Sequence, residues 1–257
     1  MIVPLEQSPL LQNANIRHGF FGRKGGCSTG EFASLNVSET SADDPENVRA
    51  NRAAALACIG ERPSLASLTP AHSADVVTLT QSPDPAARPE ADGMATSLSG
   101  IALGILTADC VPVLFADPVA GVVGACHAGW KGAIAGIVDN TVKAMEARGA
   151  ERGRLIAAIG PSISGTNYEV GPDFARAVLD RAPHAASRLF TPDGATRAHF
   201  DLPGFVADRL GYLGVEQVDR VGGCTCAEPE RYFSHRHATH SGGSTGRQIA
   251  LSCLGRD

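Results

Sequence analysis

The chain has 257 residues, of which 43% are hydrophobic and 19% are charged, and its net charge is −5 at pH 7. These proportions exclude an intrinsically disordered chain, and without a basic block there is no reason to expect a nucleic acid or a membrane as a partner. No basic, apolar leader opens the sequence, and the longest uncharged run near its centre is too short to span a bilayer, so we expect a cytoplasmic protein.

Helices and strands are predicted from capping residues and from apolar runs. Asp44 and Pro45 begin a helix that Gly60 ends, and Gly149 and Gly214 end two later helices. Short runs rich in Val, Ile and Leu predict the strands. In chain order we expect strand 16–21, helix 42–60, strands 75–80, 101–107, 111–116 and 121–127, helix 131–149, strand 154–159, helices 171–183 and 201–214, and strands 217–221 and 247–253.

The balance of these elements predicts the fold class. Strands outnumber helices and several are almost continuously apolar, which indicates a sheet buried on both faces or two packed sheets with helices outside. We therefore expect an α+β (mixed α/β) fold in which packed mixed sheets are flanked by outer helices. The proline-rich stretch 82–93 is interpreted as a surface loop, so residues 1–257 are expected to form a single domain.

The segment TADCVPVLFADPVAGVVGACHAGWKG, residues 107–132, places a cysteine and a histidine at the two ends of a predicted hairpin. If the turn centres between Pro118 and Val119, Cys110 lies directly opposite His127, at the separation that two ligands of one zinc ion require. The alternative interpretation is a buried strand cysteine and a core histidine, because both residue types are often buried without a ligand.

A third ligand candidate is His72, which precedes the strand at 75–80. With Cys110 and His127 it completes a set of two histidines and one cysteine. Three protein ligands leave a coordination position open, which is typical of catalytic rather than structural zinc. In a purely structural alternative, zinc would only tie the hairpin to the segment around His72.

A second group of possible ligands lies near the C-terminal end. Cys224 and Cys226 are followed by His235, His237 and His240, but C-x-C is not the usual C-x₂-C spacing of a structural zinc site. We interpret this segment as a polar loop near the active site. The odd number of cysteines, seven, and the missing secretion signal argue against a disulfide framework.

Three further loops carry polar candidates. Arg23 lies in the glycine-rich stretch 18–30, and arginine is suited to phosphate or carboxylate. Lys131 lies at the predicted start of a helix, where free N–H groups favour anions. Glu169 follows a predicted strand in the loop 159–171. Each of these is also consistent with an ordinary surface loop.

Six motifs in order along the chain resemble one family: HGFFGRKGG, SLNVS, TADCVPVLFAD, HAGWKG, IGPSISGTNYEVG and TGR, from residue 18 to residue 247. They resemble the bacterial YfiH-type family, also called the laccase-domain (polyphenol-oxidase-like) or peptidoglycan editing factor family. The resemblance implies zinc ligands at His72, Cys110 and His127. It also implies purine nucleosides and phosphate as small-molecule substrates, cleaved to the base and ribose 1-phosphate, with methylthioadenosine phosphorolysis and adenosine deamination as related activities.

Within this interpretation, Arg23 and Lys131 are the candidates for binding phosphate, and Asp109 or Glu169 for proton transfer. The alternatives are a copper-dependent polyphenol oxidase (laccase) and an amidase acting on cell-wall precursors. A blue-copper site normally adds a weak axial methionine, and none of Met1, Met94 and Met145 lies near the motifs. The sequence leaves the preferred nucleoside and the oligomeric state open.

Overall fold

The computed structural model describes residues 3–60, 63–84 and 87–255. It has a mixed α/β fold, as predicted. The helices are α1 Pro9–Asn13, α2 Pro45–Ala57, α3 Trp130–Ala135, α4 Ile137–Glu146, α5 Pro172–Arg181, α6 Leu202–Tyr212 and α7 His235–Ser241, with short 3₁₀ turns η1 Gly30–Phe32, η2 Arg152–Arg154, η3 Gly165–Asn167 and η4 Pro183–Arg188.

The strands form three mixed or antiparallel sheets. The strands are β1 Leu5–Glu6, β2 Arg17–Phe21, β3 Ser64–Ser67, β4 Val76–Leu79, β5 Gly93–Thr96, β6 Ile101–Thr107, β7 Val111–Asp117, β8 Val122–Ala128, β9 Ile156–Ile159, β10 Glu169–Val170, β11 Leu189–Phe190, β12 Ala198–Phe200, β13 Gln217–Arg220 and β14 Gln248–Cys253. The sheet orders are β1-β2-β14-β6-β3, β13-β9-β7-β8-β5-β4 and β10-β12-β11.

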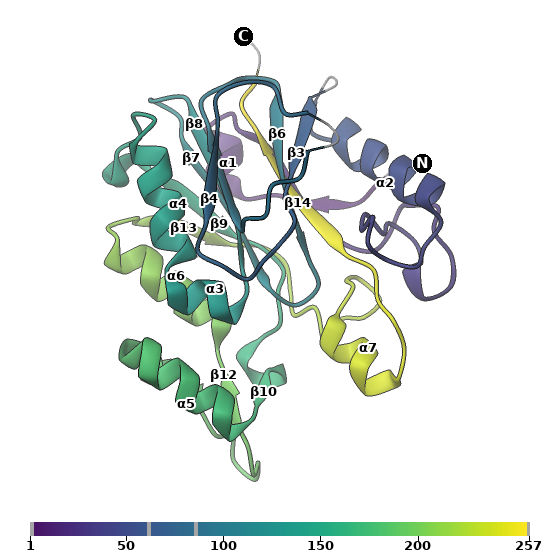
Figure 1. Cartoon of the computed structure of the whole chain (residues 1–257), viewed down its shortest axis with the longest axis vertical. Coiled ribbons are helices and arrows are strands. Elements are labelled where there is room, and N and C mark those ends of the chain that lie inside the picture. Colours follow the sequence, from purple (N-terminus) through teal and green to yellow (C-terminus); the bar gives the residue numbers. More distant parts are fainter. Residues whose placement is uncertain (1–2, 61–62, 85–86, 256–257) are drawn as a thin grey trace.

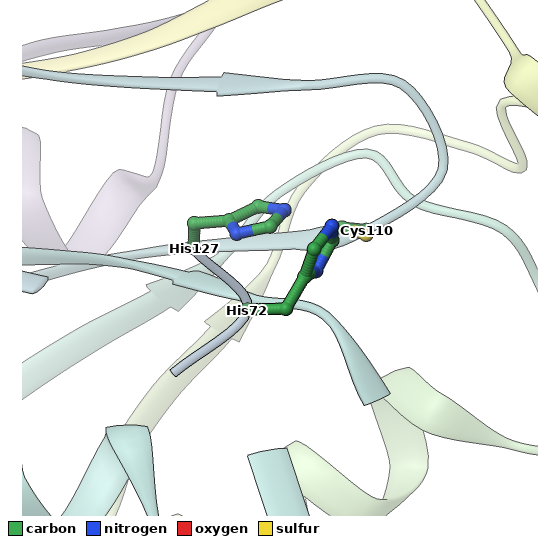
Figure 2. Close-up of side chains that lie close together, drawn as sticks. All are labelled: His72, Cys110 and His127. Carbon is green, nitrogen blue, oxygen red and sulfur yellow. The ribbon is translucent and has the colours of Figure 1, made fainter. Parts of the chain in front are cut away.

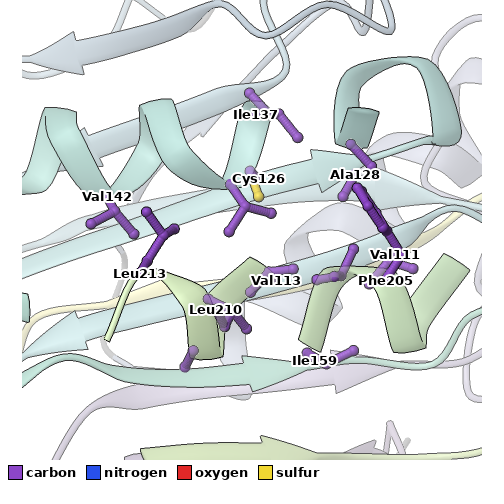
Figure 3. Packing of buried hydrophobic residues seen from close by; sticks show 14 of the residues in the cluster. Val111, Val113, Cys126, Ala128, Ile137, Val142, Ile159, Phe205, Leu210 and Leu213 are labelled. Atoms are coloured by element: carbon purple, nitrogen blue, oxygen red, sulfur yellow. The ribbon is translucent and has the colours of Figure 1, made fainter. Parts of the chain in front are cut away.

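The two larger sheets pack face to face between outer helices, and α2 and the pair α4 and α6 lie on opposite sides of them (Figure 1). One apolar cluster, which includes Phe20, Leu103 and Leu114, fills the space between the sheets. A second joins α4 and α6 to the six-stranded sheet (Figure 3). A third joins α2 to the five-stranded sheet through Ala55 and Leu251. Of the two arrangements expected from the sequence, the structure has packed sheets with outer helices.

The alternation of side chains along the β7–β8 hairpin explains why both strands are apolar throughout. Val113 and Phe115 face the helices, whereas Leu114 faces the other sheet. His127 lies at the end of the row formed on β8 by Val123 and Ala125, which also face the other sheet. The strand pattern therefore carries His127 to one end of the core between the sheets.

The register of this hairpin differs from the predicted one. Pro112, not Cys110, lies opposite His127, and Cys110 precedes the paired residues. The turn centres one residue later than expected, because Asp117 accepts hydrogen bonds from the N–H groups of Val119 and Ala120 and the strand resumes only after Gly121, whose φ is 62°. Cys110 still lies near His127, but through the loop that joins β6 to β7.

Two other predicted segments also differ from the structure. The helix expected over 131–149 is two helices, α3 and α4, because Gly136 adopts a φ of 96° between them. The polar loop expected over 234–240 is helix α7, which Ser234 caps at its N-terminus and Gly242 ends in the left-handed conformation. The expected loop 82–93 includes residues 85 and 86, which lie outside the described residues; its described part forms no helix or strand before β5.

No helix in the described ranges combines the length and the apolar character needed to cross a membrane.

Candidate metal centre

His72, Cys110 and His127 come together in the fold although they belong to three separate segments. One ligand atom of each lies within 4.8 Å of those of the other two. Figure 2 shows the three side chains gathered at the end of the strands. The ring centroids of His72 and His127 lie 5.0 Å apart. His127 is on β8, Cys110 is in the β6–β7 loop, and His72 is in the loop before β4.

The backbone around these side chains is held in a conformation that few residues adopt. Asp109, directly before Cys110, has a φ of 91°, and His72 itself has a φ of 54°. Left-handed backbone at non-glycine residues costs free energy and concentrates at functional sites, where the surrounding structure enforces it. The side chain of Asp109 accepts hydrogen bonds from the Thr225 hydroxyl at 2.7 Å and from the Arg236 N–H at 2.6 Å, which fixes the turn that presents Cys110.

At two positions near the cluster, a residue larger than glycine would collide with its neighbours. A β-carbon on Gly129 would lie 2.6 Å from Nδ1 of His72 and 3.2 Å from Sγ of Cys110, so no side chain fits there without displacing the cluster. A β-carbon on Gly132 would lie 2.5 Å from the Ser73 carbonyl oxygen. The HAGWKG motif therefore carries glycine where the loop of His72 packs against α3.

Asp92 positions two of the three candidate ligands. Its Oδ1 lies 2.8 Å from Nδ1 of His127, and its Oδ2 accepts hydrogen bonds from the N–H groups of Ser73 and Ala71, at 2.6 and 3.1 Å, and from the Ser73 hydroxyl at 3.0 Å. Asp92 is fully buried. A carboxylate behind a histidine is the usual partner of a metal-binding imidazole, because it fixes the ring and leaves the other nitrogen free.

The electrostatics of the cluster favour a cation. Burial lowers the pKa of His127, but the neighbouring Cys110 and Asp92 outweigh burial and raise that pKa to about 9. Burial also works to raise the pKa of Asp92, yet its hydrogen bonds from His127 and Ser73 lower it to about 2, so Asp92 is ionised. Burial, together with the charge of His127, lowers the pKa of His72, which favours the neutral imidazole that a metal requires.

A cavity of about 410 Å³ opens beside the cluster. His72, Cys110 and His127 line one part of it. The rest is lined by residues 38–40 and 68–70, by one residue each of α2, of the loop before β5 and of α7, by the end of β6 and the residue after it, and by the residue before β14. The polar or charged residues of this lining outside the cluster are Ser38, Glu39, Thr40, Arg52, Thr69, Arg88, Thr107, His235 and Arg247.

The candidates for phosphate binding and for proton transfer lie in different surroundings. The guanidinium group of Arg23 donates to the carbonyl oxygens of Ala33, Glu31 and Pro229 and does not line the cavity. Lys131 is exposed on α3. The side chain of Glu169 forms an ion pair with Arg197 at 3.0 Å on the surface. The structure therefore brings together the three candidate metal ligands and Asp109, but not Arg23 or Glu169.

The second group of cysteines and histidines does not converge. Within the described residues the only group of three or more such side chains with metal-binding spacing is His72, Cys110 and His127. Cys224 instead accepts a hydrogen bond from the Ser164 N–H. The three histidines of this group lie on α7, and His235 is the one among them that lines the cavity.

Sequence reasoning missed Asp92, Arg52, Arg88 and Arg247. Asp92 could have been found from its place before Gly93 at the start of an apolar run, since a lone carboxylate entering a buried strand needs partners. Arg247 belongs to the TGR motif, but nothing in the sequence indicated which residues it would face. Arg52 sits on an otherwise ordinary helix, and the sequence gives no signal for its role.

The donor set of the cluster fits a metal ion. A thiol and two imidazoles, one of them held by a buried carboxylate, are ligands that zinc and copper both accept, whereas Mg²⁺ and Ca²⁺ prefer oxygen. The fold and the site thus define a mixed α/β protein with a candidate metal centre at one end of its packed sheets.

The chain belongs to the family described as multi-copper polyphenol oxidoreductase laccase, whose model matches residues 17–255. A purine nucleoside phosphorylase of Deinococcus radiodurans is 39% identical over 255 residues, covering 99% of this chain and 94% of the relative. Another purine nucleoside phosphorylase, from Corynebacterium glutamicum, is 37% identical and covers 96% and 97%.

Solved structures agree with this membership. The protein NMB0706 of Neisseria meningitidis has a TM-score of 0.85 and 32% identity, with 99% of both chains covered. The protein YfiH of Bacillus licheniformis has a TM-score of 0.84 and 27% identity, with 93% of both covered. The resemblance inferred from the six sequence motifs is confirmed.

Proposed function

We propose that this protein is a metal-dependent purine nucleoside phosphorylase that cleaves adenosine, inosine or methylthioadenosine with phosphate. The observation that carries the proposal is the cluster of His72, Cys110 and His127 lining a polar cavity. The names of the two relatives above, which match this chain over almost its whole length, support the nucleoside and phosphate as substrates. Adenosine deamination is proposed as a secondary activity of the same site.

His72, Cys110 and His127 would hold the metal, for which we propose zinc. When bound there, zinc would supply a Lewis acid that polarises a substrate oxygen or lowers the pKa of a water. The residues around it prepare the site in advance. Asp92 accepts the Nδ1 proton of His127, which leaves Nε2 as the nitrogen that would lose its proton and bind the metal. Because residue 129 is glycine, the space beside the ligands holds no side chain from that position.

Asp109 is proposed here as a positioning residue. Both of its carboxylate oxygens already accept hydrogen bonds, from Thr225 and from the Arg236 N–H, and these bonds hold the turn before Cys110. Glu169 is paired with Arg197 on the surface, so a role for it in proton transfer would require its side chain to turn toward the cavity. Substitution of Asp109 or Glu169 by the matching amide separates these roles through the pH dependence of kcat.

The family description favours one other candidate, a copper-dependent polyphenol oxidase. Two histidines and a cysteine also form the core of a blue-copper site. However, Met94 and Met145 are buried in the apolar clusters away from the cavity, and Met1 lies outside the described residues. The described residues also lack a second histidine cluster that would hold additional copper. Oxidation of a phenol by the copper-loaded protein would favour this alternative.

Product analysis by chromatography tests the proposed function. Zinc-loaded protein is incubated with adenosine, inosine or methylthioadenosine, with and without phosphate. The comparison variants are Cys110→Ala and, as a matched control, Cys58→Ala, which removes an exposed thiol at the end of α2. Free base that forms only with phosphate, in wild type and Cys58→Ala but not in Cys110→Ala, supports phosphorolysis at the cluster. Inosine formed from adenosine without phosphate indicates deamination.

If neither product forms, the nucleoside hypothesis is wrong for this protein. Hydrolysis of a cell-wall precursor amide would then be the next activity to assay.

A further inference from the structure

Three arginines from distant parts of the chain line the cavity beside the candidate metal cluster. Arg52 is on α2, Arg88 is in the loop between β4 and β5, and Arg247 directly precedes β14. Glu39 is the only carboxylate in the lining. The cavity wall therefore carries more positive than negative charge, which favours an anion in the cavity.

Arg52 and Arg88 are held together by that one carboxylate. Nη1 of Arg52 lies 2.5 Å from Oε1 of Glu39, and Nη1 of Arg88 contacts the other oxygen, Oε2. The side chain of Arg52 is only 12% exposed, and its buried Nε has no hydrogen-bond partner within the described parts of the chain. One carboxylate shared by two guanidinium groups leaves a net positive charge, which favours a second anion beside them.

The guanidinium group of Arg247 also has few hydrogen-bond partners among the described residues. Among the residues that the structure describes, its guanidinium donates one hydrogen bond, from Nη1 to the carbonyl oxygen of its neighbour Gly246. Its backbone N–H is fixed by Oδ1 of Asn36, so the position of the residue is defined while most of its five side-chain N–H groups remain free. Burial lowers the pKa of Arg247, and the charges of Cys110 and Asp109 oppose that shift, which places the guanidinium within electrostatic range of the cluster.

We propose that Arg52, Arg88 and Arg247 bind a phosphate group in this cavity, with Glu39 as the residue that positions the first two. A tetrahedral dianion accepts hydrogen bonds on every side, which matches guanidinium groups arriving from three separate segments. Hydroxyl groups of Thr40 and Thr107, also in the lining, provide further donors. This inference rests on the proposed function, which requires phosphate as a substrate, and it replaces Arg23 and Lys131 as the phosphate ligands.

The phosphate group has two possible sources, free inorganic phosphate or the phosphate of a nucleotide. Binding is measured by isothermal titration calorimetry on the zinc-loaded protein, with inorganic phosphate and with adenosine 5′-monophosphate, and with adenosine as the uncharged comparison. The variants are Arg247→Gln and Arg88→Gln, and the matched control is Arg49→Gln, which removes the same charge from an exposed position on α2 outside the cavity.

Loss of one charge-assisted hydrogen bond is expected to weaken phosphate binding about 10- to 100-fold. We expect this loss in Arg247→Gln, a smaller loss in Arg88→Gln, whose side chain is 36% exposed, and no change in Arg49→Gln. Adenosine binding should change less than threefold in every variant. Arg88→Gln alters only a partly exposed side chain, so the test remains valid if Arg247→Gln does not fold.

The outcomes separate this inference from the proposed function. Arginine-dependent binding of either phosphate compound supports the phosphate site, and the compound that binds identifies the source. Unchanged phosphate affinity in both variants, or no binding of either compound to wild type, overturns it. In the product assay, phosphorolysis that persists in Arg247→Gln with an unchanged KM for phosphate would overturn the site but not the activity. Arginine-dependent binding without phosphorolysis would overturn the activity but not the site.

Discussion

Asp92 offers the sharpest test of how the metal centre is built. In Asp92→Asn the side chain keeps its shape but has one acceptor oxygen and one amide donor. If the oxygen faces His127, the amide faces the N–H of Ser73, which now contacts Oδ2 at 2.6 Å, and two donors oppose each other. If the oxygen faces Ser73, the amide faces Nδ1 of His127 and forces the proton onto Nε2, where the metal should bind.

Either orientation weakens metal binding. Loss of such a supporting group typically costs 10- to 100-fold in metal affinity, or about 1.4–2.8 kcal/mol. We therefore expect the dissociation constant of zinc to rise about 10- to 100-fold in Asp92→Asn, measured by competition with a coloured chelator at pH 7. The matched control is Asp75→Asn, which makes the same change at an exposed position before β4.

A zinc affinity of Asp92→Asn within threefold of wild type, in a protein that remains folded, would refute this account. It would mean that the geometry of His127 is set by the strand alone and that the carboxylate is not needed to select its tautomer. Far-ultraviolet circular dichroism of the metal-free variant establishes that the fold is intact before the comparison is made.

The remaining predictions concern the space at the site, one buried ion pair and the core. In Gly129→Ala the new methyl group would meet Nδ1 of His72, so zinc content should fall below one tenth of wild type by atomic absorption, whereas Gly153→Ala, which meets nothing, should bind normally. For Asp117, burial raises the pKa but hydrogen bonds from Arg154 and two backbone N–H groups lower it overall. Asp117→Asn should therefore lower the free energy of unfolding by about 2 kcal/mol at pH 7. That difference should shrink as the pH falls below about 4 through the folded-state pKa of Asp117, and a constant difference down to pH 2 would contradict it. Fully buried Phe115→Ala should cost about 3–5 kcal/mol in urea unfolding, and a loss below 1 kcal/mol would show that the core collapses around it.

Most of the fold could be predicted from local patterns. All eight predicted strands form within a few residues of their predicted ranges, because apolar runs between turn residues mark buried strands well. The short strands β1, β3, β5 and β10 to β12 were missed, since two to four residues with few apolar side chains give no periodicity. Helix α7 was missed although Ser234 and Gly242 mark its ends, because its histidines suggested ligands rather than a helix.

The candidate site could be predicted only in part. The proposed ligands follow from residue type and family resemblance. The predicted hairpin register, which placed Cys110 opposite His127, was wrong because the turn centres one residue later. Their proximity instead depends on the left-handed backbone of Asp109, which no periodicity reveals. Arg52, Arg247 and the segment that holds both Arg88 and Asp92 lie far apart in the sequence, so only tertiary structure can show that they share a site.

The position of β14 has a consequence for the order in which the protein can assemble. This strand, close to the C-terminal end of the described residues, pairs with β2 near the other end and with β6 in the middle. During synthesis, the edges of β2 and β6 that pair with β14 stay open until residues 248–253 have left the ribosome. Pairing across such sequence separations is slow. Arg247 and Thr107 line the cavity at one end of this β6–β14 pairing, where Thr107 lies opposite Gln248, so this wall of the cavity cannot form before β14 is in place.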